Sequence, residues 1–289
     1  MKRLEGKVAT VAGATRGAGR AMAIKLGEAG ATVYVTGRTT RHQLSPMGRK
    51  ETIEETAEQV TRAGGKGISV RVDHTIEAEV RQLFEQIKSE QSGKLDLLVN
   101  DIWGGDPLTE WGKDIADHDL QKGLQMQKQA VHAHLITAHY AVPLMKANKR
   151  GLLVEITDGV DETYRGNIYY SLAKVSNIHM AKAMGEALKA YGITSVALTP
   201  GFLRSEAMLD LFGVTEENWR DGSKVEPHFI ASESPAYIGE ALKHLASDPE
   251  VHRFNGQALS TWGLSEVYHF KDADGSQPHW GNYFDHHVK

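Results

Sequence analysis

Residues 7–20, KVATVAGATRGAGR, join a short apolar run to a loop with three glycines. Residues 8–12 have the composition of a buried strand, and residues 20–29 have that of a helix that ends at Gly30. The glycines between them follow the spacing G-x-x-x-G-x-G: Gly13, Gly17 and Gly19. Glycine here permits a tight turn, close approach of the backbone to a pyrophosphate, and close packing of helix on sheet. The stretch predicts a phosphate-binding loop, with a glycine-rich surface turn as the alternative.

The start of this helix offers N–H groups that can bind an anion. We therefore expect a dinucleotide cofactor to contact the loop through five residues: Gly13, Thr15, Arg16, Gly17 and Gly19. The position of the loop, directly after the first strand of the chain, favours this interpretation.

Length and composition limit the possible classes of protein. The chain has 289 residues, of which 40% are hydrophobic and 24% charged, which suits one large α/β domain or two small ones. The formal net charge of −4 gives no indication of nucleic-acid binding. There are no cysteines, which excludes disulfides, thiolate metal sites and a cysteine nucleophile.

The sequence also bears on location. The first strand begins too early to leave room for a signal peptide, and no apolar run approaches the ~18 residues that span a membrane. We expect a cytoplasmic protein with neither a membrane nor a nucleic-acid partner.

The rest of the chain alternates short apolar runs with helical stretches, which is typical of a parallel sheet covered on both faces. Further strands are predicted at residues 31–36, 68–72, 95–99, 152–156, 193–198 and 257–260. Helices are predicted at residues 52–63, 76–89, 119–147 and 169–190. No break in composition separates these units. The prediction is an α/β fold with a parallel sheet of about seven strands in three layers, as one domain over residues 1–289.

The end of the second predicted strand bears on cofactor choice. An acidic side chain there would bind the adenosine ribose hydroxyls of NAD, but the chain has Thr36-Gly37-Arg38. The guanidinium of Arg38 suits the 2′-phosphate of NADP, and Arg16 and Arg41 could contribute to the same site. We expect NADP(H) to be preferred over NAD(H); the alternative is that these arginines are solvated loop residues.

A second informative stretch is Tyr170-Ser-Leu-Ala-Lys174. Residues i and i+4 share a helix face, so the phenol and the ammonium should lie close together. A free phenol has a pKa near ~10, and a neighbouring cation would lower it. Such a pair can exchange a proton with an alcohol or carbonyl oxygen while a hydride moves to or from a nicotinamide. The motif is short and occurs by chance in many helices, so its interpretation depends on the presence of the glycine loop in the same chain.

These motifs together resemble those of the short-chain dehydrogenase/reductases, over about residues 4–263. The matching residues are Gly13, Gly17, Gly19, Asp73, Asn100, Tyr170, Lys174, Pro200 and Gly201. Within the family, the segment from ATVYVTGR to Asn100 is most similar to a branch of mammalian dehydrogenase/reductases. The resemblance implies a Rossmann-type, doubly wound fold with NAD(P).

The resemblance also implies a role for each matching residue. Asp73 would contact the adenine, and Asn100 would support the ribose region. Tyr170 would be the catalytic acid/base, and Lys174 would bind the nicotinamide ribose. Pro200-Gly201 would flank the nicotinamide.

A variable substrate lid would cover about residues 202–233, according to the same resemblance. We expect its inner face to be apolar, formed by Met208, Leu209, Leu211, Phe212 and Trp219. The family also implies a homodimer or homotetramer that forms through the long fourth and fifth helices.

The chain departs from the family where a serine after the fifth strand orients the substrate carbonyl. The serine position falls on Asp158, or on Thr157 if the loop differs by one residue. Thr157 would retain a hydroxyl donor, whereas an ionised Asp158 would repel the oxyanion that forms in carbonyl reduction. Three explanations remain open: Asp158 is protonated, Thr157 takes its place, or the substrate carries a positive charge.

Two further family motifs differ. The family's Asn-Asn-Ala-Gly reads Asn100-Asp101-Ile102-Trp103, so only its first member is retained. The asparagine of the fourth helix that holds a water relay falls near Ala130. We expect this relay to be absent or built differently.

Other features have less specific interpretations. His132 and His134 would lie about 200° apart on a helix, so no metal site is expected among the fourteen histidines. Three tryptophans could line a pocket or pack in the core: Trp103, Trp111 and Trp262. The polar tail, about residues 264–289, is typical of a frayed end. Its three aromatics nevertheless suggest docking on the body or on a neighbouring subunit: Trp280, Tyr283 and Phe284.

The predicted function is NADP(H)-dependent transfer of hydride between the nicotinamide and a carbonyl, alcohol or imine of a small, largely apolar substrate. Tyr170 would protonate the substrate oxygen, and Lys174 would adjust Tyr170. The alternative is a nucleotide-binding sensor or scaffold without turnover, which the changes at Asp158 and Ala130 favour. The retained Tyr170 and Lys174 favour the enzyme.

Overall fold

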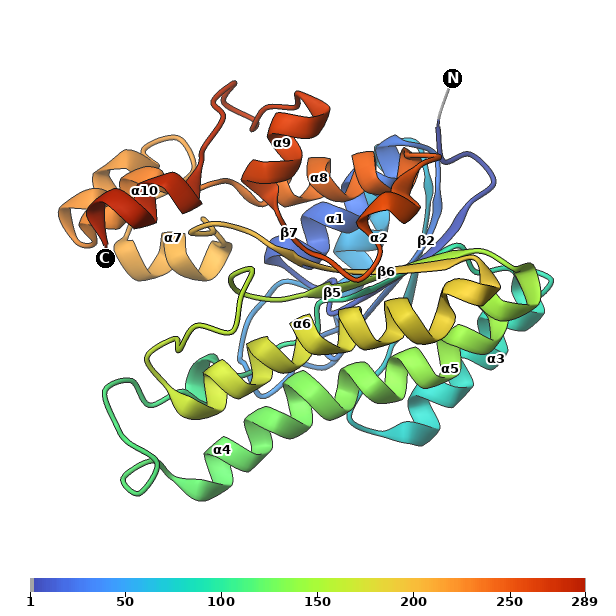
Figure 1. The fold of residues 1–289 in the computed structure, drawn as a ribbon, viewed down its shortest axis with the longest axis horizontal. Helices are drawn as coiled ribbons and strands as arrows, with labels where there is room; N and C mark the ends of the chain where they lie inside the picture. The colour runs from blue at the N-terminus through green and yellow to red at the C-terminus, as the bar shows by residue number, and fades with distance from the viewer. Residues whose placement is uncertain (1–2, 289) are drawn as a thin grey trace.

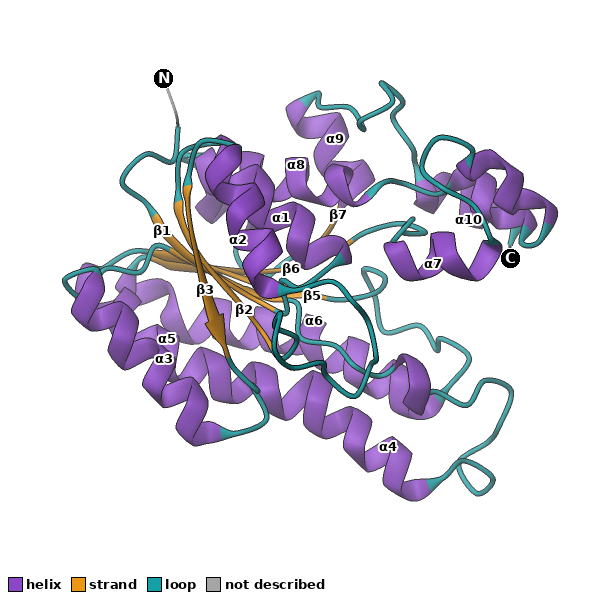
Figure 2. Cartoon of the chain, turned by 180° about the vertical axis from the view of Figure 1, so that it is seen from behind, coloured by secondary structure: helices purple, strands orange, loops and turns teal. Residues whose placement is uncertain are grey.

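The computed structural model describes residues 3–288, which form one seven-stranded sheet between two layers of helices (Figures 1 and 2). The strands are β1 (Val8–Ala12), β2 (Thr32–Gly37), β3 (Lys66–Arg71), β4 (Leu97–Asn100), β5 (Gly151–Ile156), β6 (Ile193–Thr199) and β7 (Ala258–Ser260). Their order is β3-β2-β1-β4-β5-β6-β7, and all neighbours are parallel. The predicted doubly wound α/β fold is confirmed. Met1, Lys2 and Lys289, at the ends of the predicted domain and tail, lie outside the described residues.

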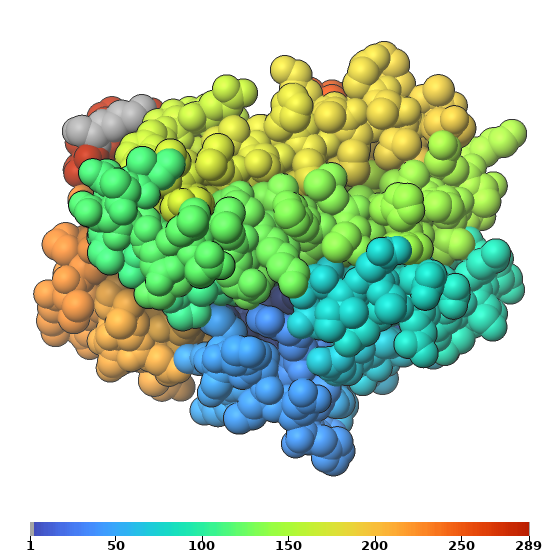
Figure 3. Space-filling view, turned by 90° about the horizontal axis from the view of Figure 1, so that it is seen from below, coloured from blue at the N-terminus to red at the C-terminus, as the bar shows by residue number. Residues whose placement is uncertain are grey.

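Helices cover both faces of this sheet. One layer contains α1 (Gly17–Glu28), α2 (Ile53–Arg62) and α8 (Pro235–Ser247), and the other contains α3 (Glu77–Glu90), α4 (Leu120–Gln127), α5 (Ala133–Asn148) and α6 (Ile168–Leu188). Successive strand residues point to opposite faces, so Leu98 packs with the second layer and Val99 with the first. Figure 3 shows the second layer from outside, where α4 and α5 lie end to end and α6 runs beside them.

The helix predicted over residues 119–147 is present from Leu120 to Asn148 and contains one π-helical turn. Lys128–His132 form a π-helical segment between α4 and α5, and the buried Ala130 lies at its centre. A π segment holds an extra residue in one turn and so changes which side chains face the sheet. The predicted helix is confirmed, but the π turn within it was not predicted, because this bonding pattern leaves no mark in the composition.

Helix α8 is absent from the predicted elements, although its start carries a signal. Ser234 caps it by accepting a hydrogen bond from the N–H of Ala236 at 3.2 Å, and a proline opens its first turn. The helix packs on α1 at Gly239, where a Cβ would lie 2.9 Å from the carbonyl oxygen of Ala21. This contact completes the first layer.

Three further helices lie beyond the carboxyl ends of the strands: α7 (Glu206–Phe212), α9 (Thr261–Tyr268) and α10 (Trp280–His287). Figures 1 and 2 show α7 and α10 together at one end of the molecule. Between residues 3 and 288, none of the helices has the length and apolar character needed to cross a bilayer.

The strand order sets the place of the site. The connection from β1 leads to β2 on one side of the sheet, and the connection from β4 leads to β5 on the other. A crevice therefore opens between the carboxyl ends of β1 and β4, which is where open α/β sheets bind ligands.

Candidate functional site

The glycine loop lies in this crevice. After β1, the N–H groups of Gly13 and Ala14 donate to the carbonyl of Thr36 at 3.0 and 2.9 Å, which turns the chain toward α1. Gly13 has a φ of +88°, and a Cβ on it would collide with the carbonyl of Asp101. A Cβ on Gly19 would collide with the carbonyl of Gly13. Glycine is therefore required for the loop, α1 and the end of β4 to pack this closely.

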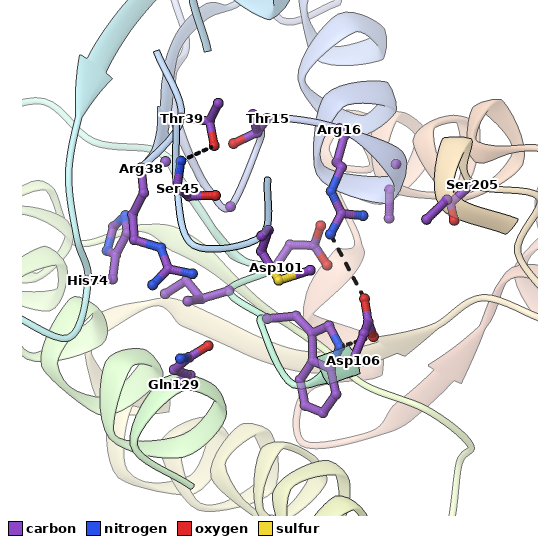
Figure 4. A pocket seen from close by; sticks show the side chains of 18 of the residues that line it. Thr15, Arg16, Arg38, Thr39, Ser45, His74, Asp101, Asp106, Gln129 and Ser205 are labelled. Atoms are coloured by element: carbon purple, nitrogen blue, oxygen red, sulfur yellow. Dashed lines mark hydrogen bonds and ion pairs between the residues drawn. The ribbon is translucent and has the colours of Figure 1, made fainter. Parts of the chain in front are cut away.

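A cavity of about 280 Å³ follows the loop (Figure 4). Six of the predicted cofactor contacts line it: Gly13, Thr15, Arg16, Gly17, Arg38 and Asp73. Its lining also includes Ser45, His74, Asp101, Trp103, Asp106, Gln129, Ser205 and Met208. The other predicted site residues are not part of this lining: Gly19, Asn100, Thr157, Asp158, Tyr170, Lys174, Pro200 and Gly201. The structure thus gathers the predicted phosphate and adenosine contacts around one cavity.

Arginines supply positive charge to this cavity. The Arg38 guanidinium lies in it (Figure 4), and within residues 3–288 it makes no ion pair. Arg16 Nη2 lies 3.9 Å from the carboxylate of Asp106. Arg41, expected as a third member, does not line the cavity, because it pairs with Glu58 of α2 at 2.7 Å. The prediction for Arg41 is therefore wrong, and Arg38 and Arg16 remain.

Asp73 follows β3 and faces the same cavity. Its Oδ1 accepts hydrogen bonds from the N–H and the hydroxyl of Thr75, at 3.0 and 2.7 Å. Burial opposes ionisation, but these bonds and the charges of Arg38 and Arg71 lower the pKa of Asp73. An ionised carboxylate here can accept a hydrogen bond from an amino group such as that of adenine.

Two carboxylates of the chain itself lie at the N-terminus of α1. Glu206, from the start of α7, accepts a hydrogen bond from the N–H of Gly17 at 2.8 Å. Asp101 accepts a hydrogen bond from the N–H of Gly19. Desolvation raises the pKa of Asp101 to about 7, although the positive charge of Lys174 and this hydrogen bond favour ionisation. The helix N-terminus thus already attracts anionic groups, as its dipole predicts.

The predicted Tyr–Lys pair lies on α6. Asn167 caps this helix by accepting a hydrogen bond from the N–H of Tyr170 at 3.1 Å. The Tyr170 hydroxyl donates to Oδ2 of Asp158 at 2.9 Å. The Thr157 hydroxyl points elsewhere and donates to the backbone carbonyl of Lys174 at 2.8 Å. Of the two candidates for the family's serine position, Asp158 is therefore the one that faces the phenol.

The surroundings of the pair shift both pKa values. Burial and the carboxylate of Asp158 raise the pKa of Tyr170 well above its usual value. Burial lowers the pKa of Lys174, although three nearby carboxylates favour its charged form. The predicted lowering of the Tyr170 pKa is wrong for this structure. The reason is that burial of the phenol and its hydrogen bond to the Asp158 carboxylate both oppose ionisation, whereas the Lys174 ammonium lies 5.3 Å from the ring centre.

Two tryptophans enclose the Tyr170 ring. The ring centres of Trp103 and Trp111 lie 5.5 and 5.2 Å from it. Trp103 also lines the cavity, and its indole N–H donates to Asp106 at 2.6 Å. The Lys174 ammonium lies 4.1 Å from the centre of the Trp103 ring. The sequence left the role of these tryptophans open, and the structure places both at the phenol.

Asn100 belongs to a buried network beside the cavity. Its Nδ2 donates to Glu155 at 2.8 Å, and the second oxygen of Glu155 lies 2.6 Å from Nδ1 of His134. Nε2 of His134 lies 3.0 Å from the carbonyl oxygen of Ile102. The network joins β4, β5 and α5, so Asn100 can support the loop after β4 without lining the cavity. At the predicted relay position, Ala130 is buried and has no polar side chain to offer.

The loop after β6 carries Pro200 and Gly201 and is covered by the tail. The N–H of Gly201 donates to Oε2 of Glu233 at 2.9 Å. A Cβ on Gly201 would lie 2.6 Å from the Cβ of Trp280. The Trp280 ring also contacts Phe202, with 5.7 Å between ring centres. Helix α10 therefore docks on the body of its own chain.

The segment predicted as a lid is mostly apolar inside, with one exception. Met208 lines the cavity, Phe212 packs on Phe229, and Trp219 is buried. Leu211 is 68% exposed, so its prediction is wrong: it lies on the side of α7 that faces solvent.

Sequence reasoning missed several residues at the cavity. Asp106 and Gln129 line it, and Glu206 binds the glycine loop. The loop of Asp106 is recognisable by its Gly-Trp-Asp composition, but composition does not say which side chain faces inward. Glu206 lies in the first turn of α7, and nothing near it in the sequence indicates a contact with α1.

A glycine loop at the switch point of a parallel sheet, next to a Tyr-x-x-x-Lys helix, is the arrangement of a dinucleotide-dependent α/β oxidoreductase. A family model described as short chain dehydrogenase matches residues 7–212. The mouse (Mus musculus) protein Dehydrogenase/reductase SDR family member 1 is 31% identical over 276 residues, 94% of this chain and 85% of that protein. The chain belongs to the short-chain dehydrogenase/reductase family, an oxidoreductase family that uses NAD(P)(H), and the resemblance found in the sequence is confirmed.

Two other similar proteins extend this comparison. The Arabidopsis thaliana protein named NADPH-dependent aldehyde reductase-like protein, chloroplastic, is 26% identical over 240 residues, 82% of this chain and 84% of that protein. The crystal structure of a short chain dehydrogenase from Mycobacterium thermoresistibile covers 96% of this chain and 92% of its own. It has a TM-score of 0.79 at 20% identity. The structural likeness supports the fold.

Proposed function

We propose that the protein is an NADP(H)-dependent oxidoreductase that acts on a carbonyl, alcohol or imine of a small, largely apolar substrate. One observation carries the proposal: the Tyr170 ring and the Lys174 ammonium both contact Trp103, and this indole lines the cavity that begins at the glycine loop. When bound, the nicotinamide supplies or accepts the hydride. The residues of the chain bind the cofactor, orient the substrate and transfer protons.

The residues at the cavity fit such a dinucleotide. Gly13 and Gly17 keep side chains away from the N-terminus of α1, where a pyrophosphate can approach. Asp73 would hold the adenine. Arg38, a cation without an ion-pair partner in residues 3–288, would bind the 2′-phosphate of NADP, with Arg16 near the pyrophosphate. The NADPH dependence stated in the name of the Arabidopsis relative is compatible with this preference.

The catalytic roles follow from the contacts of the phenol. Tyr170 would give its proton to the substrate oxygen or nitrogen in reduction and take it back in oxidation. Lys174 would bind the nicotinamide ribose. The side chain of Asp158 is 46% exposed, so it would transfer the proton between the Tyr170 hydroxyl and solvent. Its negative charge favours a substrate that gains positive charge, such as a protonated imine, over a ketone.

We propose that residues 202–233 cover the bound substrate. The apolar contacts of Met208 and Phe212 match a small apolar substrate. Helix α10 would support this lid, since Trp280 packs on both Gly201 and Phe202.

Oxidation of NADPH against a panel of aldehydes, ketones and cyclic imines tests the proposed function, with Tyr170→Phe as the control. We expect turnover of at least one class, loss of turnover in the variant, and retained NADPH binding. Tight binding of NADPH without turnover of any panel member would instead identify a nucleotide-binding sensor. The hydrogen bond that ties the Tyr170 hydroxyl to Asp158 is the observation that favours this second function.

We also propose a homodimer or homotetramer that forms through the face of α4, α5 and α6. Four leucines on these helices are about half exposed: Leu120, Leu124, Leu135 and Leu172. Such residues suit a subunit interface better than open solvent. Sedimentation velocity of Leu172→Glu should show smaller assemblies than the wild type, and an unchanged profile would contradict this interface.

A further inference from the structure

Trp103 separates the cavity from the Tyr–Lys pair. The cavity is lined by Trp103 and Asp106 but not by Tyr170 or Lys174. The indole contacts the phenol ring edge-on at 5.5 Å, and the Lys174 ammonium lies over its face at 4.1 Å. The indole therefore covers Lys174 on the side from which a ligand in the cavity would reach it.

Several contacts hold the indole in this position. Its N–H donates to Oδ1 of Asp106 at 2.6 Å, a hydrogen bond to a charged acceptor. The ammonium of Lys174 adds a cation–π contact in a poorly solvated place. The six-membered ring packs on Gly105, where a Cβ would collide with it. Together these contacts favour the covered conformer over one in which the indole is displaced.

Asp106 also connects the indole to the phosphate loop. Arg16 Nη2 lies 3.9 Å from Oδ2 of Asp106, as the dashed line in Figure 4 shows. A phosphate at the glycine loop would compete with Asp106 for Arg16, because arginine binds phosphate through two parallel hydrogen bonds. Without the Arg16 contact, the side chain of Asp106 is less firmly fixed. The hydrogen bond to Asp106 then fixes Trp103 less firmly as well.

We propose that Trp103 is a movable cover over the nicotinamide end of the cofactor site, which the dinucleotide itself displaces. This proposal rests on the proposed function, since it assumes that Lys174 binds the nicotinamide ribose. A ligand that contains only the adenosine and phosphate half weakens the Arg16–Asp106 contact, but it does not reach the place of the indole and so binds without displacing it. The complete dinucleotide has to displace it, so its apparent affinity is reduced by the fraction of molecules in which the cover is closed.

Calorimetric titrations with NADPH and with 2′,5′-ADP test the cover. We expect Trp103→Ala to bind NADPH about tenfold more tightly than the wild type, and 2′,5′-ADP equally well. Trp103→Phe retains a ring over Lys174 but loses the hydrogen bond to Asp106, so its gain should be intermediate. Trp111→Ala is the matched control, because Trp111 contacts the same phenol at 5.2 Å without lining the cavity, and it should change neither affinity.

Fluorine NMR gives a second readout that does not depend on activity. The chain contains five tryptophans, so 5-fluorotryptophan labelling yields five resonances, and the one lost in Trp103→Phe belongs to Trp103. We expect this resonance to shift strongly with NADP⁺, which displaces the indole, and much less with 2′,5′-ADP, whose phosphate weakens only the Arg16–Asp106 contact. The proposal would be overturned if Trp103→Ala gained no affinity for NADPH relative to 2′,5′-ADP. It would also be overturned if the Trp103 resonance did not shift on addition of NADP⁺. Absence of binding by both ligands would overturn the proposed function as well.

Discussion

The two ends of the proposed cofactor site differ in the groups that form them. At the proposed adenosine end, backbone turns and glycines shape the site, and single side chains such as Asp73 and Arg38 project into it. At the proposed nicotinamide end, carboxylates and indoles crowd the phenol, with Asp158 bonded to it and Trp103 against it. The contrast indicates that the proposed adenosine end depends on backbone geometry and a few side chains, while the proposed nicotinamide end depends mainly on side chains packed around the phenol. Substitutions at the adenosine end should therefore change cofactor affinity, and substitutions at the nicotinamide end should change turnover.

The largest effect should come from the nicotinamide end. Tyr170→Phe removes the only hydroxyl bonded to Asp158 in the described chain, and kcat should fall about 10³-fold, within the usual range for loss of a general acid. The dissociation constant of NADPH should stay nearly unchanged, since Tyr170 does not line the cavity. Steady-state kinetics and fluorescence titration measure the two quantities. Tyr164→Phe, an exposed tyrosine in the loop before α6, is the control. Retained turnover in Tyr170→Phe would remove this residue from the chemistry.

At the adenosine end, the corresponding change is Arg38→Ala. Loss of charge-assisted hydrogen bonds should weaken NADPH binding about 10-fold to 100-fold and leave NADH binding nearly unchanged. Arg41→Ala should alter neither, because Arg41 pairs with Glu58 outside the cavity. Competitive titration of both cofactors provides the measurement. An equal loss for NADPH and NADH would show that Arg38 does not read the 2′-phosphate.

Asp158→Ser tests whether the carboxylate of Asp158 controls proton transfer by Tyr170. The change removes the charge that raises the pKa of Tyr170, so the pH–rate profile for alcohol oxidation should move to lower pH. Ketone reduction should rise by about tenfold, since a hydroxyl donor replaces a charge that repels the oxyanion. Asp161→Ser is the control, because Asp161 and Asp158 lie at 3.8 and 3.9 Å from the same Arg165. If the pH–rate profile of Asp158→Ser has its inflection at the same pH as the wild type, Asp158 does not raise the pKa of Tyr170.

The smallest effect concerns Asp101, which lies between the two ends. Desolvation raises its pKa to about 7, above the ordinary value of 3.8, so the folded protein binds this proton more tightly than the unfolded chain. This contribution to the free energy of unfolding is complete below about pH 4 and is lost as the pH rises through 7. Between pH 6 and 8 the wild type should therefore lose about 1 kcal/mol more than Asp101→Asn. Urea unfolding measures this difference, with the exposed Asp117→Asn as control. Parallel curves for Asp101→Asn and wild type would contradict the raised pKa.

Most of the fold could be predicted from the sequence because its signals are local. The buried strands of a parallel sheet are continuous apolar runs, and the three glycines of the loop follow the first of them. The π segment at Lys128–His132 could not be predicted in this way, because one extra residue in a turn does not change the composition. The capped start of α8 at Ser234 could have been recognised, since a cap and a proline both mark it.

The site was predictable only where its residues lie near each other in the sequence. Tyr170 and Lys174 share one helix face, and Gly13, Thr15 and Arg16 share one loop. The contact of Glu206 with α1 joins residues 189 positions apart, and no local pattern encodes it. The sequence also could not decide between Thr157 and Asp158, because one residue of loop length decides which side chain faces the phenol. Burial of the phenol, together with that geometry, reversed the expected shift of the Tyr170 pKa.

The packing of α10 on the loop after β6 has a consequence for biosynthesis. Residues 8–19, with the first strand and the glycine loop, leave the ribosome long before Trp280 is translated. The contacts of Trp280 with Gly201 and Phe202 can form only after this helix has emerged. During synthesis, the layer that contains α1 is completed only when α8 has emerged, and the packing of α10 on the loop after β6 forms later still. The contacts of Trp280 with the loop after β6 are therefore among the last in the fold to form.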